Sequence, residues 1–65
     1  MKEFYFSNKK LDERELSEIK TAIPGCDIGF TGLETVKGFQ YSLMFSGDSA
    51  LLSGLATLRK YGLHR

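Results

Sequence analysis

The sequence has few of the residues from which cross-links, metal sites and catalytic sites are usually built. Its 65 residues include one cysteine, one histidine, one proline and no tryptophan. One cysteine excludes an internal disulfide framework, and one cysteine with one histidine cannot supply the ligands of a structural zinc site. We therefore expect no metal and no cofactor, and we expect a reducing, cytoplasmic setting, which is typical of small domains without disulfides.

Long apolar runs and a strong charge are also missing. No segment approaches the ~18 consecutive apolar residues of a membrane span, and the opening Met-Lys-Glu-Phe-Tyr-Phe lacks the apolar core of a signal peptide. The formal net charge is +1, which is too small for a protein that binds many phosphates by charge alone. With 42% apolar residues, the chain is expected to fold as one domain over residues 1–65.

Enzyme chemistry is not expected from the two residues that are most often catalytic. Cys26 alternates with Ile28 and Phe30 in an apolar pattern, which predicts a buried and inert thiol. A cysteine nucleophile needs a base within hydrogen-bonding reach, and the only histidine, His64, lies in the terminal tail.

The clearest pattern in the chain is an alternation of residue types over Lys37–Ser46. A period of two places alternate side chains on opposite faces of a β-strand. We interpret this segment as the central strand of a sheet. Its core-facing set is expected to be Phe39, Tyr41, Leu43 and Phe45.

Shorter alternations predict two more strands, over Lys2–Ser7 and Cys26–Thr31. Gly32–Gly38 is expected to be a long hairpin loop whose apolar residues fold back onto the core. In the first strand we expect Phe4 and Phe6 to face the core. The opposite face of the sheet is then expected to show Glu3, Tyr5, Ser7, Gln40, Ser42 and Met44.

Two helices are expected, over Asp12–Ile23 and Ala50–Tyr61. The first begins with a capping box, because Asp12 and Glu15 have the spacing at which each side chain bonds the other's backbone N–H. Asp48 is the expected N-cap of the second helix, and Gly62 is expected to end it in a Schellman motif. The expected buried stripe of the second helix is Leu51, Leu52, Leu55 and Leu58. The expected frayed tail is His64 and Arg65.

The order strand, helix, strand, strand, helix predicts an α+β fold. We expect a two-layer βαββα sandwich whose antiparallel sheet has the strand order 2-3-1, with both helices on one face. This is half of a ferredoxin-like fold, in which a fourth strand would lie beside the first. The Lys2–Ser7 edge is therefore expected to be open, unless its shortness, its twist or the C-terminal tail protects it.

An open edge invites strand addition by another chain. Our first hypothesis is a small non-enzymatic protein-interaction module, a regulator or inhibitor of the size that phages and mobile elements often encode. Its partner is another protein, or a second copy in a homodimer formed through Lys2–Ser7. The expected partner-binding residues are Glu3, Tyr5, Ser7, Gln40, Ser42 and Met44.

The second hypothesis is a single-stranded RNA or DNA binder. The element order, with an aromatic first strand and Lys37-Gly38-Phe39-Gln40-Tyr41 opening the third, resembles a truncated RNA-recognition motif. The resemblance implies that bases stack on Tyr5, Phe39 and Tyr41, with Lys37 beside them. That arrangement would turn Gln40 and Ser42 into the core without partners, which is unfavourable.

Overall fold

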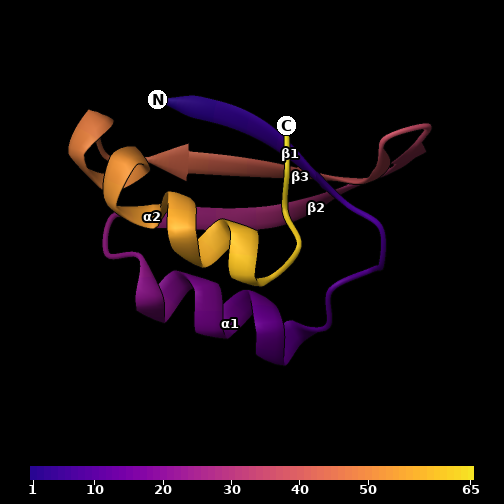
Figure 1. Ribbon diagram of the computed structural model, residues 1–65, viewed down its shortest axis with the longest axis horizontal. Helices are drawn as coiled ribbons and strands as arrows, with labels where there is room; N and C mark the ends of the chain where they lie inside the picture. The colour runs from indigo at the N-terminus through magenta and orange to yellow at the C-terminus, as the bar shows by residue number, and fades with distance from the viewer.

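The computed structural model describes residues 1–65 as three strands and two helices (Figure 1). The elements are β1 (Lys2–Ser7), α1 (Glu13–Ala22), β2 (Cys26–Thr35), β3 (Gly38–Phe45) and α2 (Asp48–Lys60). The sheet order is β1-β3-β2, and both neighbouring pairs are antiparallel. The predicted α+β fold with the third strand in the middle is confirmed.

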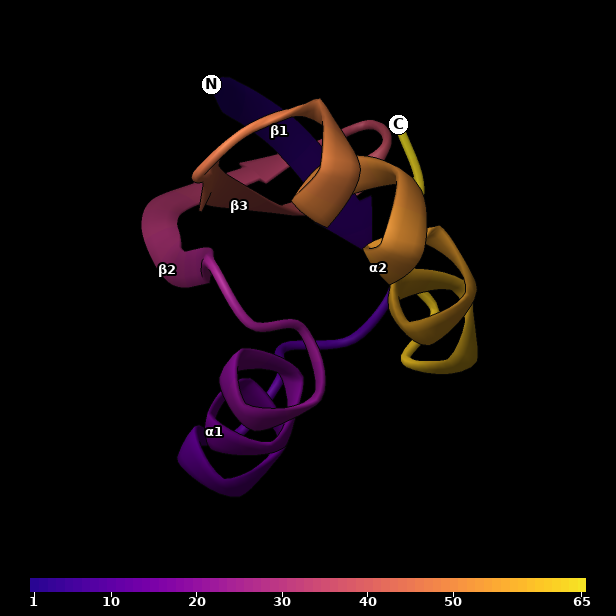
Figure 2. The same cartoon turned by 90° about the vertical axis from the view of Figure 1, so that its left-hand side faces the viewer.

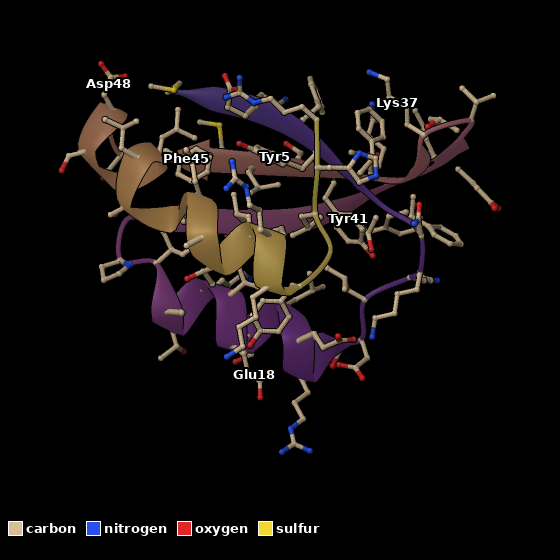
Figure 3. The ribbon with its side chains drawn as sticks, viewed as in Figure 1. Tyr5, Glu18, Lys37, Tyr41, Phe45 and Asp48 are labelled. Atoms are coloured by element: carbon tan, nitrogen blue, oxygen red, sulfur yellow. The ribbon has the colours of Figure 1, made fainter.

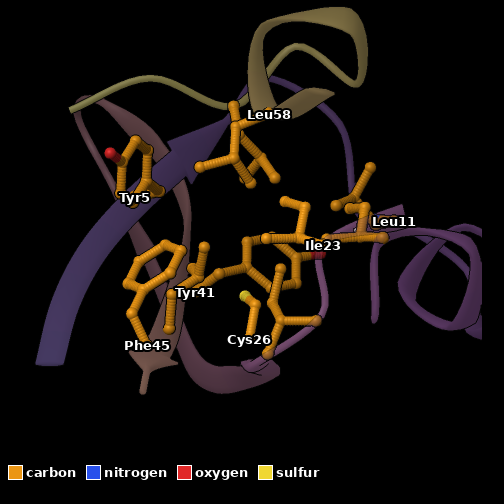
Figure 4. Close-up of a cluster of buried hydrophobic side chains, with 11 residues drawn as sticks. Tyr5, Leu11, Ile23, Cys26, Tyr41, Phe45 and Leu58 are labelled. Carbon is orange, nitrogen blue, oxygen red and sulfur yellow. Dashed lines mark hydrogen bonds between the residues drawn. The ribbon is translucent and has the colours of Figure 1, made fainter. Parts of the chain in front are cut away.

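One face of the sheet and both helices share a single buried core. Figure 4 shows side chains from β1, β3 and α2 turned toward one another around Tyr41, which is fully buried. Ile19 of α1 and Leu58 of α2 belong to the same cluster, and both helices pack on the same core (Figure 2). The cluster comprises Tyr5, Leu11, Ile19, Ile23, Cys26, Ile28, Tyr41, Leu43, Phe45, Leu58 and Leu63.

The two faces of β1 are the reverse of the prediction. Tyr5 pairs with Tyr41 across the ladder, and directly opposite residues of an antiparallel pair share a face. Tyr5 is therefore on the core side and only 3% exposed, whereas Phe4 is 47% exposed. The alternation Phe-Tyr-Phe-Ser has aromatic residues in both phases, so the pairing with β3 rather than the pattern decides the face.

The β2–β3 hairpin is longer than predicted, because β2 continues to Thr35. Most of the expected Gly32–Gly38 loop is thus strand, and only Val36 and Lys37 lie between the paired residues Thr35 and Gly38. The register shifts between Phe30 and Glu34, which makes a bulge in β2. The apolar side chains near the tip, Leu33 and Val36, are exposed and do not fold back onto the core.

The helix termini are partly as predicted. The capping box of Asp12 and Glu15 is present at the start of α1. The second helix begins earlier than expected, with Gly47 rather than Asp48 at the N-cap. Gly62 has φ +78°, and backbone bonds from Gly62 to Arg59 and from Leu63 to Leu58 complete the predicted Schellman motif.

The predicted buried stripe of α2 is only partly correct. Leu58 is buried, and Leu51 and Leu55 are half-buried. Leu52 is 69% exposed.

Neither helix has the length and apolar content needed to cross a membrane.

Candidate functional site

The C-terminal tail lies along the outer edge of β1 and is not frayed. In Figure 1 the tail rises from the end of α2 to β1. His64 forms an antiparallel bridge with Phe6: the Phe6 N–H donates to the His64 carbonyl at 2.6 Å, and the His64 N–H donates to the Phe6 carbonyl at 2.9 Å. The imidazole lies beside the Phe6 ring, with centroids 6.4 Å apart.

Arg65 holds the tail to the core side of β1. Its Nη2 lies 2.6 Å from Glu3 Oε1, its Nε donates to the Tyr5 hydroxyl at 3.4 Å, and its guanidinium lies over the Tyr5 ring. The hydrogen bond with Tyr5 raises the pKa of the guanidinium above its ordinary value. The tail therefore occupies one part of the position where a fourth strand would lie.

The rest of the β1 edge has no partner. Backbone N–H and C=O groups of alternate residues in an antiparallel strand point to opposite sides. Because the groups of Phe6 point outward to His64, those of Lys2 and Phe4 also point away from β3. Phe6–His64 is the one isolated bridge in the fold, so the outward groups of Lys2 and Phe4 remain available for a further strand.

The face of the sheet opposite the core carries aromatic and sulfur-containing side chains beside this edge. Phe4 and Met44 are about half exposed, at 47% and 48%. A lysine lies over each phenylalanine of β1: Lys2 Nζ is 5.4 Å from the Phe4 ring centroid, and Lys37 Nζ is 5.2 Å from that of Phe6. Figure 3 shows Lys37 on the side of the sheet away from the helices. We call Phe4, Phe6, Met44, Lys2 and Lys37 the open-face cluster.

The predicted partner-binding residues are divided between the two faces. Gln40, Ser42 and Met44 lie on the open face, as expected, because Ser42 and Gln40 pair with Phe4 and Phe6. The other three residues, Glu3, Tyr5 and Ser7, lie on the core side. Phe4 and Phe6 were missed as surface residues. The sequence contained one sign of this. Lys2 lies on the same face of the strand as Phe4 and Phe6 whichever residues of β3 they pair with, and a lysine favours the solvent-exposed face.

The predicted base-stacking residues do not form a platform. Tyr5 and Tyr41 are buried, and Phe39 is partly buried against the core. Tyr41 directs its hydroxyl to the backbone N–H of Leu11. Lys37 does lie on the open face, but beside Phe6 rather than beside Phe39.

Cys26 is buried, and loss of hydration raises the pKa of its thiol above the ordinary value. Its sulfur lies 3.8 Å from the carbonyl oxygen of Asp27. No three His, Cys, Asp or Glu side chains come together as a potential metal site.

A groove lies between α2 and the tail. This groove has a volume of about 460 Å³. Figure 3 shows the region from the side on which α2 and the tail cross the sheet. The residues that line the α2–tail groove are Tyr5, Leu51, Leu52, Leu55, Leu58, Arg59, Leu63, His64 and Arg65.

Comparison of the chain with protein families, curated proteins and solved structures found no match.

Proposed function

We propose that the protein is a non-enzymatic interaction module that binds a β-strand of another protein, or of a second copy, along the outer edge of β1. The observation that carries the proposal is the pair of unpartnered backbone positions at Lys2 and Phe4, next to the edge position that His64 already occupies. A strand added there would gain main-chain hydrogen bonds, and its side chains would meet the open-face cluster. Its proposed role is to regulate or inhibit the protein that it binds.

The outer edge of β2 is a weaker candidate. The backbone groups of Ile28 and Phe30 also point outward, because those of Asp27 and Gly29 point toward β3. The bulge that follows Phe30 interrupts this edge. Bulges generally increase the local twist of a strand, which is one of the ways in which proteins protect edges. No half-exposed aromatic side chain comparable to Phe4 stands beside it.

A substitution by proline tests the proposal directly. Phe4→Pro removes an outward N–H without removing a bond to β3, because edge strands accept proline where the N–H faces solvent. Tyr5→Pro is unsuitable, since the Tyr5 N–H points into the β1–β3 ladder. Phe4→Ala is the matched control: it removes the same ring but keeps the N–H.

The measurement is association by each folded variant. Sedimentation over a concentration series reports self-association, and recovery of a stoichiometric protein with the tagged chain reports a foreign partner. Strand addition predicts that Phe4→Pro loses association that Phe4→Ala retains at least in part. Equal association by the two variants, with native circular dichroism in both, would contradict it.

The open-face cluster also favours a second function, binding of single-stranded nucleic acid. Phe4 and Phe6 are two residues apart on an antiparallel sheet, and each has a lysine over its ring. An exposed cation–π contact contributes about 0.5–1 kcal/mol, whereas stacking of a base on an aromatic ring contributes about 1–3 kcal/mol. A base can therefore displace Lys2 from the ring of Phe4.

Salt dependence separates the two functions. Binding of a fluorescent oligothymidylate should weaken steeply as salt rises if lysines release counterions from phosphates, and Lys37→Gln should reduce that slope. Lys60→Gln, which removes the same charge from α2, is the control. Absence of salt-dependent binding to the oligothymidylate would contradict the nucleic-acid function, and a partner protein whose binding is insensitive to nuclease would support the first function.

A further inference from the structure

We propose that the α2–tail groove binds a small amphipathic anion, an alkyl carboxylate whose chain lies along the leucines and whose carboxylate meets Arg59. This site is separate from the strand edge, and the proposal does not rest on the function proposed above. The groove combines an apolar floor with cationic groups at its rim.

The floor of the groove is made by residues that the fold already holds in place. Leu58 and Leu63 are almost fully buried, and the Schellman motif fixes their relative position. Tyr5 is held by Arg65 on one side of its ring. An apolar ligand therefore meets a surface formed in advance, which reduces the ordering that binding requires.

The wall on the α2 side leaves apolar surface in water. Leu52 is 69% exposed, and Leu51 and Leu55 are half-buried. Covering such surface is favourable in proportion to the apolar area removed from water. An alkyl chain lying between Leu52 and Leu63 would remove this area from water.

The charge at the rim selects the sign of the head group. Arg59 and Arg65 bring positive charge to the groove, and no aspartate or glutamate lines it. Arg65 already pairs with Glu3, but the side chain of Arg59 makes no hydrogen bond or ion pair. Arg59 thus has free donors in the geometry that suits a carboxylate.

The size of the groove selects the class of ligand. A volume of about 460 Å³ lies in the lower part of the range for small-molecule sites, about 300–1,000 Å³. A helix with its side chains is about 10 Å across and does not fit in so small a hollow. A single alkyl chain does fit. Its contacts with Leu63 and His64 would also stabilise the position of the tail, which pairs with Phe6.

The test uses decanoate with the full chain, below the concentration at which decanoate forms micelles. Chemical shifts of the leucine methyl groups and of the Leu63 amide report the site and the affinity. Two comparison ligands separate the contribution of the carboxylate from that of the alkyl chain. Acetate has the head group without the chain, and decyltrimethylammonium has the chain with the opposite charge. We expect saturable binding of decanoate alone, with the largest shifts at Leu52, Leu55 and Leu63.

Two variants of equal charge test the role of Arg59. Arg59→Gln should weaken decanoate binding by about two- to fivefold, because Arg59 is exposed and water screens its contact with the carboxylate. Lys60→Gln should leave the affinity nearly unchanged, because Lys60 does not line the groove. Absence of saturable binding, equal binding of decyltrimethylammonium, or equal weakening by the two variants would each overturn the proposal.

Discussion

The hydroxyl of Tyr41 accepts a 2.7 Å hydrogen bond from the backbone N–H of Leu11, and both residues are buried. The bond ties the central strand to the segment that leads into α1. It also satisfies an N–H that water cannot reach. Removal of this acceptor would leave the buried Leu11 N–H without a partner.

Tyr41→Phe is expected to destabilise the fold by about 1–3 kcal/mol, because the Leu11 N–H would stay buried without an acceptor. Urea denaturation followed by circular dichroism measures the change in the free energy of unfolding. The control is Tyr61→Phe, which removes an exposed hydroxyl that donates to Glu18. The interpretation would be wrong if the two variants were equally stable.

Gly54→Ala tests the contact between the two helices. A Cβ at Gly54 would lie 2.9 Å from two carbons of the Ile23 side chain. Alanine adds about 1 kcal/mol of helix propensity, but overpacking of a core usually costs about 1–3 kcal/mol. We expect net destabilisation that Ile23→Val relieves only in part in the double variant, because valine lacks Cδ1 but keeps the γ carbons.

The control for Gly54→Ala is Ser53→Ala, which changes an exposed neighbour in the same helix. That variant is expected to be as stable as the wild type or slightly more stable. A rise in thermal stability on Gly54→Ala would mean that Ile23 adopts another rotamer without strain.

Two glycines of the sheet are expected to respond in opposite ways to alanine. Gly38 has φ +119°, and a Cβ there would run into the carbonyl of Ser7. Gly29 has nothing within 4 Å of its Cβ position. Gly38→Ala should therefore lower the free energy of unfolding by more than about 1 kcal/mol, whereas Gly29→Ala should preserve or raise it. Thermal unfolding of the two variants side by side provides the comparison.

Glu15 is expected to titrate below its ordinary range. Lys9 Nζ donates to its carboxylate at 2.8 Å, and this bond, followed by the bond from the Asp12 backbone, lowers the pKa of Glu15 from 4.5. A lowered folded-state pKa means that the contribution to stability is present above the unfolded-state value and is lost as the pH falls through the folded-state value. The predicted window of loss is therefore acidic, below pH 4.5.

Carboxyl chemical shifts over an acid titration measure this pKa. Lys9→Gln should raise the pKa of Glu15 toward 4.5, and Lys10→Gln should not, because the Lys10 ammonium lies over the ring of Phe30 instead. If both lysine variants moved the pKa by the same amount, general charge rather than the Lys9 contact would be the cause.

Local signals in the sequence predicted local structure well. The capping box at Asp12 and the Schellman motif at Gly62 need only residues a few positions apart, and both are present. The strand order also follows from the pattern, because the long alternation around Tyr41 requires a neighbour on each side.

The face of β1 could not be predicted in the same way. Its pattern fits either phase, and the choice depends on the pairing of Tyr5 with Tyr41, about half the chain away. The extension of β2 was missed for a related reason. Glycine at position 32 is typical of a loop, but here Gly32 lies in a bulge of the strand with φ +90°. The Thr31 hydroxyl supports the bulge, because it donates to the Gln40 side-chain oxygen and accepts from the Leu33 N–H.

The same difficulty extends to the candidate site. The open edge followed from the strand order, but the residues beside it depended on the face of β1. The role of the tail depended on a pairing between Phe6 and His64 that no local pattern signals.

The order of pairing in the sheet has a consequence for how the protein folds. The β2–β3 hairpin joins neighbouring segments, so its loop is short and it can form early. β1 must close a much longer loop to reach β3, and the tail can bridge Phe6 only after β1 has docked. We therefore expect the amides of β1 and the tail to exchange with solvent faster than those of the hairpin. The edge proposed to receive another strand would then belong to the part of the sheet that opens most readily.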